Sequence, residues 1–379
     1  MIPRLTEEGC LGRRKQLLDS VTSDCIVLAN PRHVCYYSGF LASELTLAGW
    51  GPNYLVLDRD GRSILLVNNS AAGNAEFAFA DEVRSWTWYD AAVNPGKPVW
   101  REGHKALAAL LEELSSGRQE LVLGIEEGVF PAGAAPENTR LEDISDAVYR
   151  QRRAKDPDEL DIIRAMVDIT GKGHERARAE LKAGIREIDL YGKIYESLIA
   201  SAGETVNLFC DLISGPRAWR ATGQPGTRVI EEGDPVIIDL NPYAHGYRAD
   251  YTSTIVAAGK LTKTYRDLEN TLHRAIEAGE EKLRPGVPAG EVFKAVKKAI
   301  EAGGFGDFFD HHAGHGLGLG HPEAPFFVAD SRELLAAGDV VTLEPGAYGE
   351  GFGARIEHNY LISDSSPVRL SSHDTSFLL

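Results

Sequence analysis

Two acidic segments in the C-terminal half of the chain are near copies of each other, and no other feature restricts the fold so strongly. The first reads GDPVIID and ends at Asp239; the second reads GDVVTLE and ends at Glu344, 105 residues later. Each copy continues to a second acid, Asp250 eleven residues after Asp239 and Glu357 thirteen residues after Glu344. A hairpin repeated in this way places four carboxylates around one pseudo-twofold axis.

A group of four carboxylates requires positive charge nearby. Like charges at close range repel one another, and an unpaired buried carboxylate costs far more free energy than a fold can spare. Any one of these acids taken alone is typical of an exposed turn. Their matched spacing in two copies instead predicts a site for cations.

The duplication extends to the helices that precede each hairpin. The segment Asp156-Pro157 has an N-cap acid followed by proline at the first helical position, which is a helix start. Helical patterns separated by glycine turns are predicted over residues 157–181 and 188–202 before the first hairpin, and over 263–283 and 289–302 before the second. One unit of two helices and an acidic hairpin therefore occurs twice, at a period of about 100 residues.

The chain of 379 residues is longer than a single core usually supports, so two domains are expected. The first, residues 1–150, alternates helical and strand patterns as an α/β layer domain does. The second covers residues 155–379. Strands are predicted at residues 25–29, 53–57, 63–67 and 121–125, with a helix over 105–115.

A histidine is the expected fifth ligand, and the segment HHAGHGLGLGH, residues 311–321, holds the candidates. Glycines around His315 allow the backbone to approach a crowded site closely.

The motifs VIIDLNPYAHGYRADYTSTI, HHAGHGLGLGHPE, VTLEPG and ARIEHNYLI, in this order, resemble the catalytic domain of the pita-bread metallohydrolases. That family includes methionine aminopeptidase, aminopeptidase P, prolidase and the metal-free creatinase. The resemblance implies an α+β pita-bread domain with internal pseudo-twofold duplication, after an α/β N-terminal domain similar to that of the creatinase and prolidase branch. The ligand set that it implies is Asp239, Asp250, His315, Glu344 and Glu357.

By the same resemblance, Asp239 binds one metal, His315 and Glu344 bind the other, and Asp250 and Glu357 bridge them. Two such cations lower the pKa of a bridging water to roughly 7 and stabilise the charge of a tetrahedral intermediate. Glu344 is the expected proton shuttle. Arg355 is expected to orient the acids. Oxygen-rich coordination favours Mn²⁺, with Co²⁺, Fe²⁺ and Zn²⁺ as alternatives.

The histidines that position the substrate depart from the peptidase pattern. His311 stands four residues before the ligand, as the family requires. Seven residues after the ligand the chain has Pro322, and the nearest histidine is His321, which only an irregular backbone turns into the site. A third family histidine is replaced by Thr222. Three residues in this altered loop, which either line a different pocket or are ordinary loop residues, are Arg217, Trp219 and Arg220.

Three functions follow from these observations. The first is hydrolysis of Xaa-Pro dipeptides, or of the N-terminal Xaa-Pro bond of short peptides. The second is hydrolysis of the C–N bond of a small amide, guanidino or cyclic compound, favoured by Thr222 and the change at Pro322. The third is a binding protein without catalysis, which the complete ligand set disfavours.

Partners and location follow from composition and from the resemblance. The net charge of −16 disfavours nucleic acid. No apolar run has the length of a membrane span or signal peptide, so we expect a cytoplasmic protein. The four cysteines lack paired spacing and are expected to be free thiols. The resemblance implies a homodimer.

Overall fold

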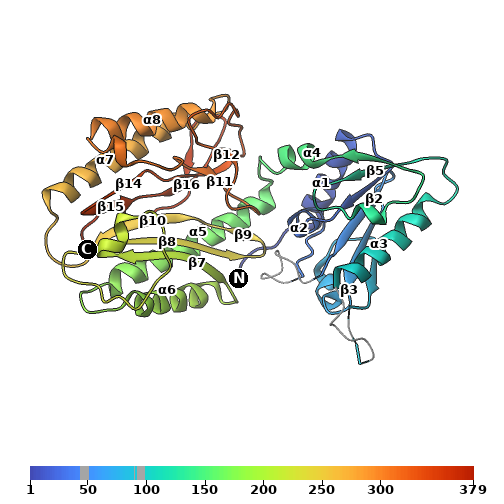
Figure 1. The fold of residues 1–379 in the computed structure, drawn as a ribbon, viewed down its shortest axis with the longest axis horizontal. Coiled ribbons are helices and arrows are strands. Elements are labelled where there is room, and N and C mark those ends of the chain that lie inside the picture. Colours follow the sequence, from blue (N-terminus) through green and yellow to red (C-terminus); the bar gives the residue numbers. More distant parts are fainter. Residues whose placement is uncertain (43–50, 89, 92–98) are drawn as a thin grey trace. The chain divides into compact units, whose positions relative to one another are not determined.

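The computed structural model describes residues 1–42, 51–88, 90–91 and 99–379. They form two compact units (Figure 1). The N-terminal unit is Arg4–Arg152, and the C-terminal unit is Arg153–Leu379 together with Met1–Pro3.

The N-terminal unit is built on a six-stranded mixed sheet with the strand order β4-β3-β2-β1-β5-β6. The four strands predicted from the sequence are confirmed within one residue at each end. The helix predicted over 105–115 begins earlier, at Val99. The strands are β1 (Cys25–Leu28), β2 (Tyr54–Asp58), β3 (Ser63–Asn68), β4 (Glu82–Trp86), β5 (Leu121–Ile125) and β6 (Thr139–Asp143). The helices are α1 (Glu7–Ser20), α2 (Pro31–Ser38), α3 (Val99–Ser115) and α4 (Ser145–Gln151).

Two helix pairs, α5 with α6 and α7 with α8, enclose the strands of the C-terminal unit from opposite sides (Figure 1). The predicted start of α5 is confirmed, because Asp156 and Glu159 form a reciprocal capping box. Helix α7 ends at Glu280, before the predicted end at residue 283. The four helices are α5 (Pro157–Glu180), α6 (Glu187–Ala202), α7 (Lys263–Glu280) and α8 (Ala289–Ala302).

The strands of this unit form two main sheets, one from each half of the duplication. The first has the order β10-β8-β7 and the second the order β12-β11-β13-β16-β17. The first contains β7 (Asn207–Ser214), β8 (Pro235–Ala244) and β10 (Tyr251–Val256), with β9 (Tyr247–Arg248) beside β8. The second contains β11 (His315–Gly316), β12 (Glu323–Phe326), β13 (Val340–Leu343), β16 (His358–Leu361) and β17 (Val368–Arg369), and a separate hairpin joins β14 (Gly346–Gly349) to β15 (Phe352–Arg355).

The two halves meet through hydrogen bonds from the backbone N–H groups of two corresponding acids. The backbone N–H of Asp250 donates to Oδ1 of Asn359 at 3.3 Å, and the backbone N–H of Glu357 donates to the carbonyl of Thr252 at 3.1 Å. The Nδ2 of Asn359 also donates to the carbonyl of Asp250 at 2.5 Å. Each acid that begins a return strand is therefore fixed by the opposite half.

Apolar packing surrounds this junction. Helices α7 and α8 bury Leu268, Leu272, Val292 and Val296 against the second sheet. The four cysteines are free and buried, which confirms the expected thiols. Within the described ranges, no helix combines the length and apolar character of a membrane span.

Replacement of Asn359 tests whether the junction stabilises the fold. Asn359→Ala leaves the backbone N–H and carbonyl of buried Asp250 without their partners, so we expect the free energy of unfolding to fall by about 2–4 kcal/mol. Urea denaturation of the metal-free protein measures this loss. Lys298→Ala, on the exposed face of α8, serves as control and should change the value by less than about 0.5 kcal/mol. Equal stability of the two variants would contradict the role of Asn359.

Candidate metal centre

Three of the four duplicated acids lie at the ends of strands, and the fourth lies within a strand. Asp239 is in the middle of β8, and Asp250 immediately precedes β10. Glu344 directly follows β13, and Glu357 lies two residues after β15, immediately before β16. Asp250, Glu344 and Glu357 are each less than 9% exposed.

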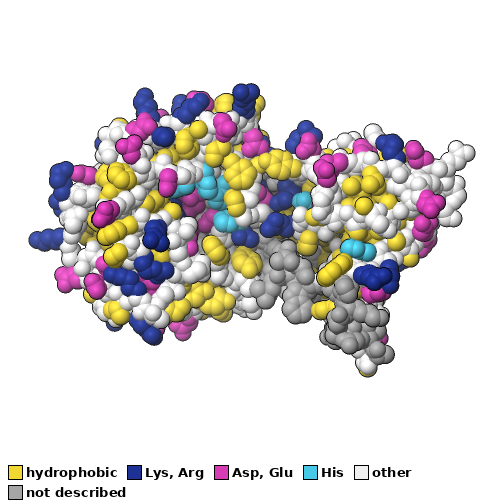
Figure 2. All heavy atoms as spheres, in the orientation of Figure 1, with side chains coloured by type: hydrophobic (Ala, Val, Ile, Leu, Met, Phe, Trp, Pro, Cys, Tyr) yellow, Lys and Arg dark blue, Asp and Glu magenta, His cyan; other side chains and the backbone are white. Residues whose placement is uncertain are grey.

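All four acids line one cavity of about 440 Å³ in the C-terminal unit. On the face seen in Figure 2, histidine side chains gather beside acidic ones over this unit. The lining consists of Phe209, Asp211, Thr222, Gly223, Gln224, Asp239, Asp250, His312, His315, His321, Pro322, Glu344, Arg355 and Glu357.

The side chains form three overlapping triads, within each of which the potential ligand atoms lie within 4.8 Å of one another. Asp250 and His315 each belong to two triads. This sharing joins the three groups into one continuous cluster. The triads are Asp239, Asp250 and Glu357; His312, His315 and Glu344; and Asp250, His315 and His321.

His315 presents one ring nitrogen to the acids. Its Nδ1 lies 2.8 Å from the carbonyl of Gly316, which accepts a hydrogen bond from the ring when Nδ1 carries the proton. That tautomer leaves the Nε2 lone pair free to bind a cation. Nε2 lies 3.5 Å from Oδ2 of Asp250 and 3.6 Å from Oε1 of Glu344.

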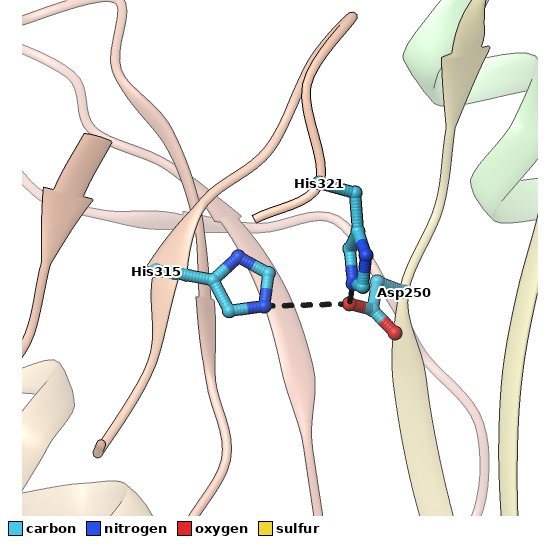
Figure 3. Close-up of side chains that lie close together, drawn as sticks. All are labelled: Asp250, His315 and His321. Carbon is cyan, nitrogen blue, oxygen red and sulfur yellow. Dashed lines mark hydrogen bonds and ion pairs between the residues drawn. The ribbon is translucent and has the colours of Figure 1, made fainter. Parts of the chain in front are cut away.

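His321 also reaches the centre, as Figure 3 shows. Its Nε2 lies 2.6 Å from Oδ2 of Asp250, the same oxygen that His315 faces. No regular strand passes through residues 317–322, so strand alternation does not fix the direction of this side chain. The irregular backbone turns His321 inward.

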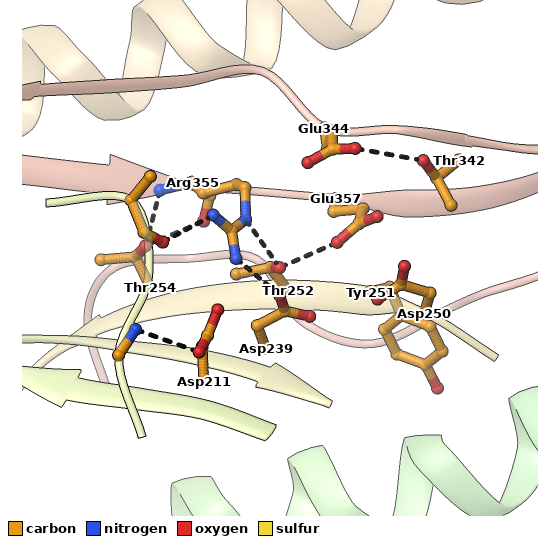
Figure 4. A network of polar contacts seen from close by, with 12 residues as sticks. Asp211, Asp239, Asp250, Tyr251, Thr252, Thr254, Thr342, Glu344, Arg355 and Glu357 are labelled. Carbon is orange, nitrogen blue, oxygen red and sulfur yellow. Dashed lines mark hydrogen bonds and ion pairs between the residues drawn. The ribbon is translucent and has the colours of Figure 1, made fainter. Parts of the chain in front are cut away.

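Arg355 supplies a fixed positive charge to the cluster (Figure 4). Its Nη2 donates to Oδ2 of Asp239 at 2.6 Å, and its Nε donates to Oγ1 of Thr252 at 3.1 Å. Thr252 in turn donates to Oε2 of Glu357 at 2.8 Å. Arg355 thus holds Asp239 directly and Glu357 through one hydroxyl.

Raised pKa values show that two of the acids, Asp239 and Glu357, lack enough positive charge nearby. Burial raises the pKa of Asp239 to about 8, although the adjacent Arg355 acts in the opposite direction. Burial and the neighbouring carboxylates raise the pKa of Glu357 well above its ordinary value. Oδ1 of Asp239 is buried and has no hydrogen-bond partner among the described residues.

The other two acids are compensated by imidazoles. Burial opposes ionisation of Asp250, but His321 and His315 lower its pKa below the ordinary value. Burial likewise opposes ionisation of Glu344, but the hydrogen bond from His312 and the charge of His315 lower its pKa to about 2. Despite burial, Asp250 and Glu344 raise the pKa of His315 to about 9.

This donor set fits divalent cations. Carboxylate oxygens and an oriented imidazole are ligands of first-row metals, and a cation beside the orphaned Oδ1 of Asp239 supplies the charge that Arg355 does not. Such a cation would favour the ionised forms of Asp239 and Glu357, whose pKa values are raised by burial and by the neighbouring carboxylates.

The five expected ligands and Arg355 all line the cavity, and so does His321. His311 is placed differently. Its Nδ1 lies 2.7 Å from the carbonyl of His312, its buried Nε2 has no hydrogen-bond partner among the described residues, and its ring packs between Phe309 and Tyr348. It is absent from the cavity lining.

His312, which the sequence interpretation missed, takes the position beside the acids. Its Nε2 lies 2.9 Å from Oε1 of Glu344, and it lines the cavity. The doubled histidine His311-His312 was the available signal.

The altered loop places different residues at the cavity from those that the sequence suggested. Thr222 lines it, but Arg217 pairs with buried Glu187, and Trp219 and Arg220 are absent from the lining. None of these three residues lines this cavity, and Arg217 and Trp219 lie in the 3-10 helix Gly215–Trp219.

Comparison with known proteins agrees with the fold and the site. Residues 161–364 match metallopeptidase family M24, and residues 11–153 match the Creatinase/Prolidase N-terminal domain. The chain is 28% identical to the probable dipeptidase PepE of Mycobacterium tuberculosis over 95% of this chain and 94% of that protein. It is 29% identical to the putative dipeptidase YkvY of Bacillus subtilis over 60% of this chain and 63% of that protein's length.

The prolidase of Pyrococcus horikoshii has a similar structure, with a TM-score of 0.80 at 25% identity over 97% of this chain and 99% of that one. The expected creatinase-like N-terminal domain and pita-bread catalytic domain are confirmed. Because the M24 match alone spans more than half of the chain, the protein belongs to metallopeptidase family M24 and is a metallohydrolase.

Proposed function

We propose that this protein is a dipeptidase with two metal ions that hydrolyses Xaa-Pro dipeptides or the N-terminal Xaa-Pro bond of short peptides. The observation that carries the proposal is the meeting of four buried acids with His315 in one cavity, where Oδ1 of Asp239 is without a partner.

Asp239 would hold one metal, His315 and Glu344 the other, and Asp250 and Glu357 both. The shared triads support this division, since Asp250 lies in a group with Asp239 and also in a group with His315. We propose Mn²⁺ as the metal, with Co²⁺, Fe²⁺ and Zn²⁺ as alternatives, because oxygen atoms dominate the ligand set.

Bound cations of this kind lower the pKa of a water and polarise the carbonyl that it attacks. The side chains of the chain supply the proton transfers and the orientation. Glu344, which lines the cavity beside His312, would accept the proton of the water and return it to the leaving nitrogen. Arg355 holds Asp239 in place. His312 and His321 face the same cavity and are available to orient the substrate. His311, expected from the sequence to act there, would support Tyr348 instead.

Substrate size and assembly complete the proposal. A cavity of about 440 Å³ accommodates a short peptide, and the relatives PepE and YkvY are named as a probable and a putative dipeptidase.

We also propose a cytoplasmic homodimer. The free buried cysteines support the cytoplasmic location, and the creatinase-like N-terminal domain supports the dimer. Sedimentation showing only monomer would contradict the dimer.

A second candidate function is hydrolysis of a small non-peptide amide, guanidino or cyclic compound. The observation that favours it is that Thr222 and Pro322, which replace two family histidines, both line the cavity. The residues that contact a substrate thus differ from those of the peptidase pattern.

Substitution of the acids tests the metal assignment. Asp239→Asn and Glu357→Gln each remove one ligand charge, so we expect bound metal per chain to fall and kcat to drop about 10³-fold or more. Elemental analysis and steady-state kinetics measure the two effects. Asp364→Asn, an acid exposed on the surface, is the matched control and should retain both. Unchanged metal content and turnover in Glu357→Gln would overturn the assignment.

A substrate panel separates the two candidate functions. With Mn²⁺ present, we expect kcat/KM for Leu-Pro to exceed that for small amides and guanidino compounds by about 100-fold or more. Proline release and ammonia release are the measurements. The reverse order of rates would favour the second function.

The pKa shifts predict how pH affects the protein after metal removal. Asp239, with an ordinary pKa of 3.8, and Glu357 and His315 all have raised pKa values in the folded state. Their stabilising protons are lost as pH rises, by about 1.4 kcal/mol per pH unit for each proton. Four histidines whose pKa values are lowered by burial (His174, His311, His358 and His373) oppose this trend below about pH 7. The melting temperature of the metal-free protein should therefore fall between about pH 7 and about 9.

The gain on adding Mn²⁺ should grow over the same interval, because deprotonated ligands bind the cation. Asp250 and Glu344 titrate below this window and contribute equally throughout. The Asp239→Asn control should show a shallower dependence. A metal-free melting temperature that rises with pH would contradict the prediction.

A further inference from the structure

Asp211 is a fifth carboxylate in the cavity, and the metal centre does not use it. It lies on β7 directly opposite Asp239 of β8. Directly opposite residues on neighbouring strands share one face of the sheet, with Cβ atoms about 4.5–5.5 Å apart. Figure 4 shows the carboxylate of Asp211 on the same side of the sheet as that of Asp239. Asp211 nevertheless belongs to none of the three triads.

The side chain is fixed but lacks a cationic partner. Asp211 is 5% exposed, and its Oδ1 accepts a hydrogen bond from the backbone N–H of Gly223 at 3.0 Å. Among the described residues no lysine, arginine or histidine forms an ion pair with it. Arg355, which also lines the cavity, is bound to Asp239. A buried carboxylate in this position is stabilised by a cation that enters the cavity.

Two divalent metals would not supply that charge, because they would offset the four ligand carboxylates. Asp211 then remains as an additional negative charge one strand away from Asp239. The cavity therefore favours a ligand that has a positive group close to the atoms held at the metal centre.

An aromatic surface continues beyond Asp211. Phe209 precedes it by two residues on the same face of β7, is 50% exposed, and also lines the cavity. This side of the cavity, formed by β7, therefore has the carboxylate of Asp211 next to Asp239 and the ring of Phe209 farther out.

We propose that Asp211 binds the α-ammonium group of the substrate, so that the enzyme selects peptides with a free amino terminus, and that Phe209 contacts an apolar first side chain. The inference rests on the proposed peptidase function. In a peptide, the α-nitrogen is about 2.5 Å from the carbonyl carbon of the same residue. A substrate whose first carbonyl is held beside Asp239 thus places its ammonium group next to Asp211.

The order of the wall excludes the alternative that Asp211 recognises a lysine or arginine side chain of the substrate. The charge of such a side chain lies several bonds beyond its aliphatic stem. That arrangement requires an apolar surface next to the metals and a carboxylate farther out, which is the reverse of Asp211 followed by Phe209.

The test compares ligands that differ only in the ammonium group. Leucinamide and 4-methylpentanamide have the same carbon skeleton, and calorimetry with the Mn²⁺-bound enzyme measures their binding without turnover. We expect the wild-type protein to prefer leucinamide by about 10- to 100-fold. Asp211→Asn keeps the shape and an acceptor for Gly223 while removing the charge, so the preference should fall to within about threefold of unity.

Kinetics give a second readout. For Leu-Pro, Asp211→Asn should raise KM far more than it lowers kcat, with bound metal per chain unchanged. Asp211→Ser should act in the same direction if the asparagine variant is unstable, and Asp364→Asn should retain the wild-type preference.

Three results for Asp211→Asn would overturn the inference. The first is an unchanged preference for leucinamide, and the second is loss of bound metal. The third is a loss of affinity for lysinamide that is larger than the loss for norleucinamide. Failure of the proposed function is a separate outcome. In that case wild-type protein does not hydrolyse Leu-Pro, while the calorimetric comparison still reports whether Asp211 selects the ammonium group.

Discussion

Repulsion among buried carboxylates is the constraint on which the rest of this structure depends. Asp239, Asp250, Glu344 and Glu357 come from two halves of a duplicated unit and are forced into one cavity. Burial first, and then the neighbouring carboxylates, raise the pKa values of Asp239 and Glu357, so both groups resist ionisation without added positive charge. A fold selected for stability alone has no reason to bring these groups together, so the cluster marks function.

The surrounding structure holds the acids in place against this repulsion. Hydrogen bonds between the halves fix the backbone of Asp250 and Glu357 at the axis, and Arg355 offsets part of the charge on Asp239. Arg355 cannot satisfy both oxygens of Asp239, since Oδ1 stays without a partner among the described residues. Arg355 thus orients Asp239, and the unpartnered Oδ1 can still bind a further positive charge.

The sequence predicted the architecture and the acids because both depend on spacing. The period of the duplication, the glycine turns and the cap at Asp156 are local signals that tertiary packing did not override. The histidines were harder to predict. His311 and His312 are adjacent, and the direction of each side chain depends on an irregular segment that has no strand or helix periodicity. His321 faces inward for the same reason.

Asp211 escaped the sequence interpretation for a different reason. Within NLFCDLIS it reads as one polar residue in an otherwise apolar strand, and only the pairing of β7 with β8 places it opposite Asp239. Thr222 was recognised as a departure from the family, but its neighbour Gly223 gains its role from a hydrogen bond to Asp211 that no spacing rule predicts. The pairing of β7 with β8 and the hydrogen bond from Gly223 to Asp211 together define this side of the cavity.

The departures from the family pattern are therefore distributed unevenly. The four acids and His315 that match the family's ligand pattern are all present, whereas Thr222, His321 and Pro322 lie in the lining around them. The segment that contains Thr222 is held on both sides by buried Glu187, which accepts hydrogen bonds from the backbone N–H groups of Ser214 and Gly226. A loop anchored in this way presents its altered residues in a fixed position. The arrangement of acids around His315 can thus be kept while the residues that line the cavity beside it change.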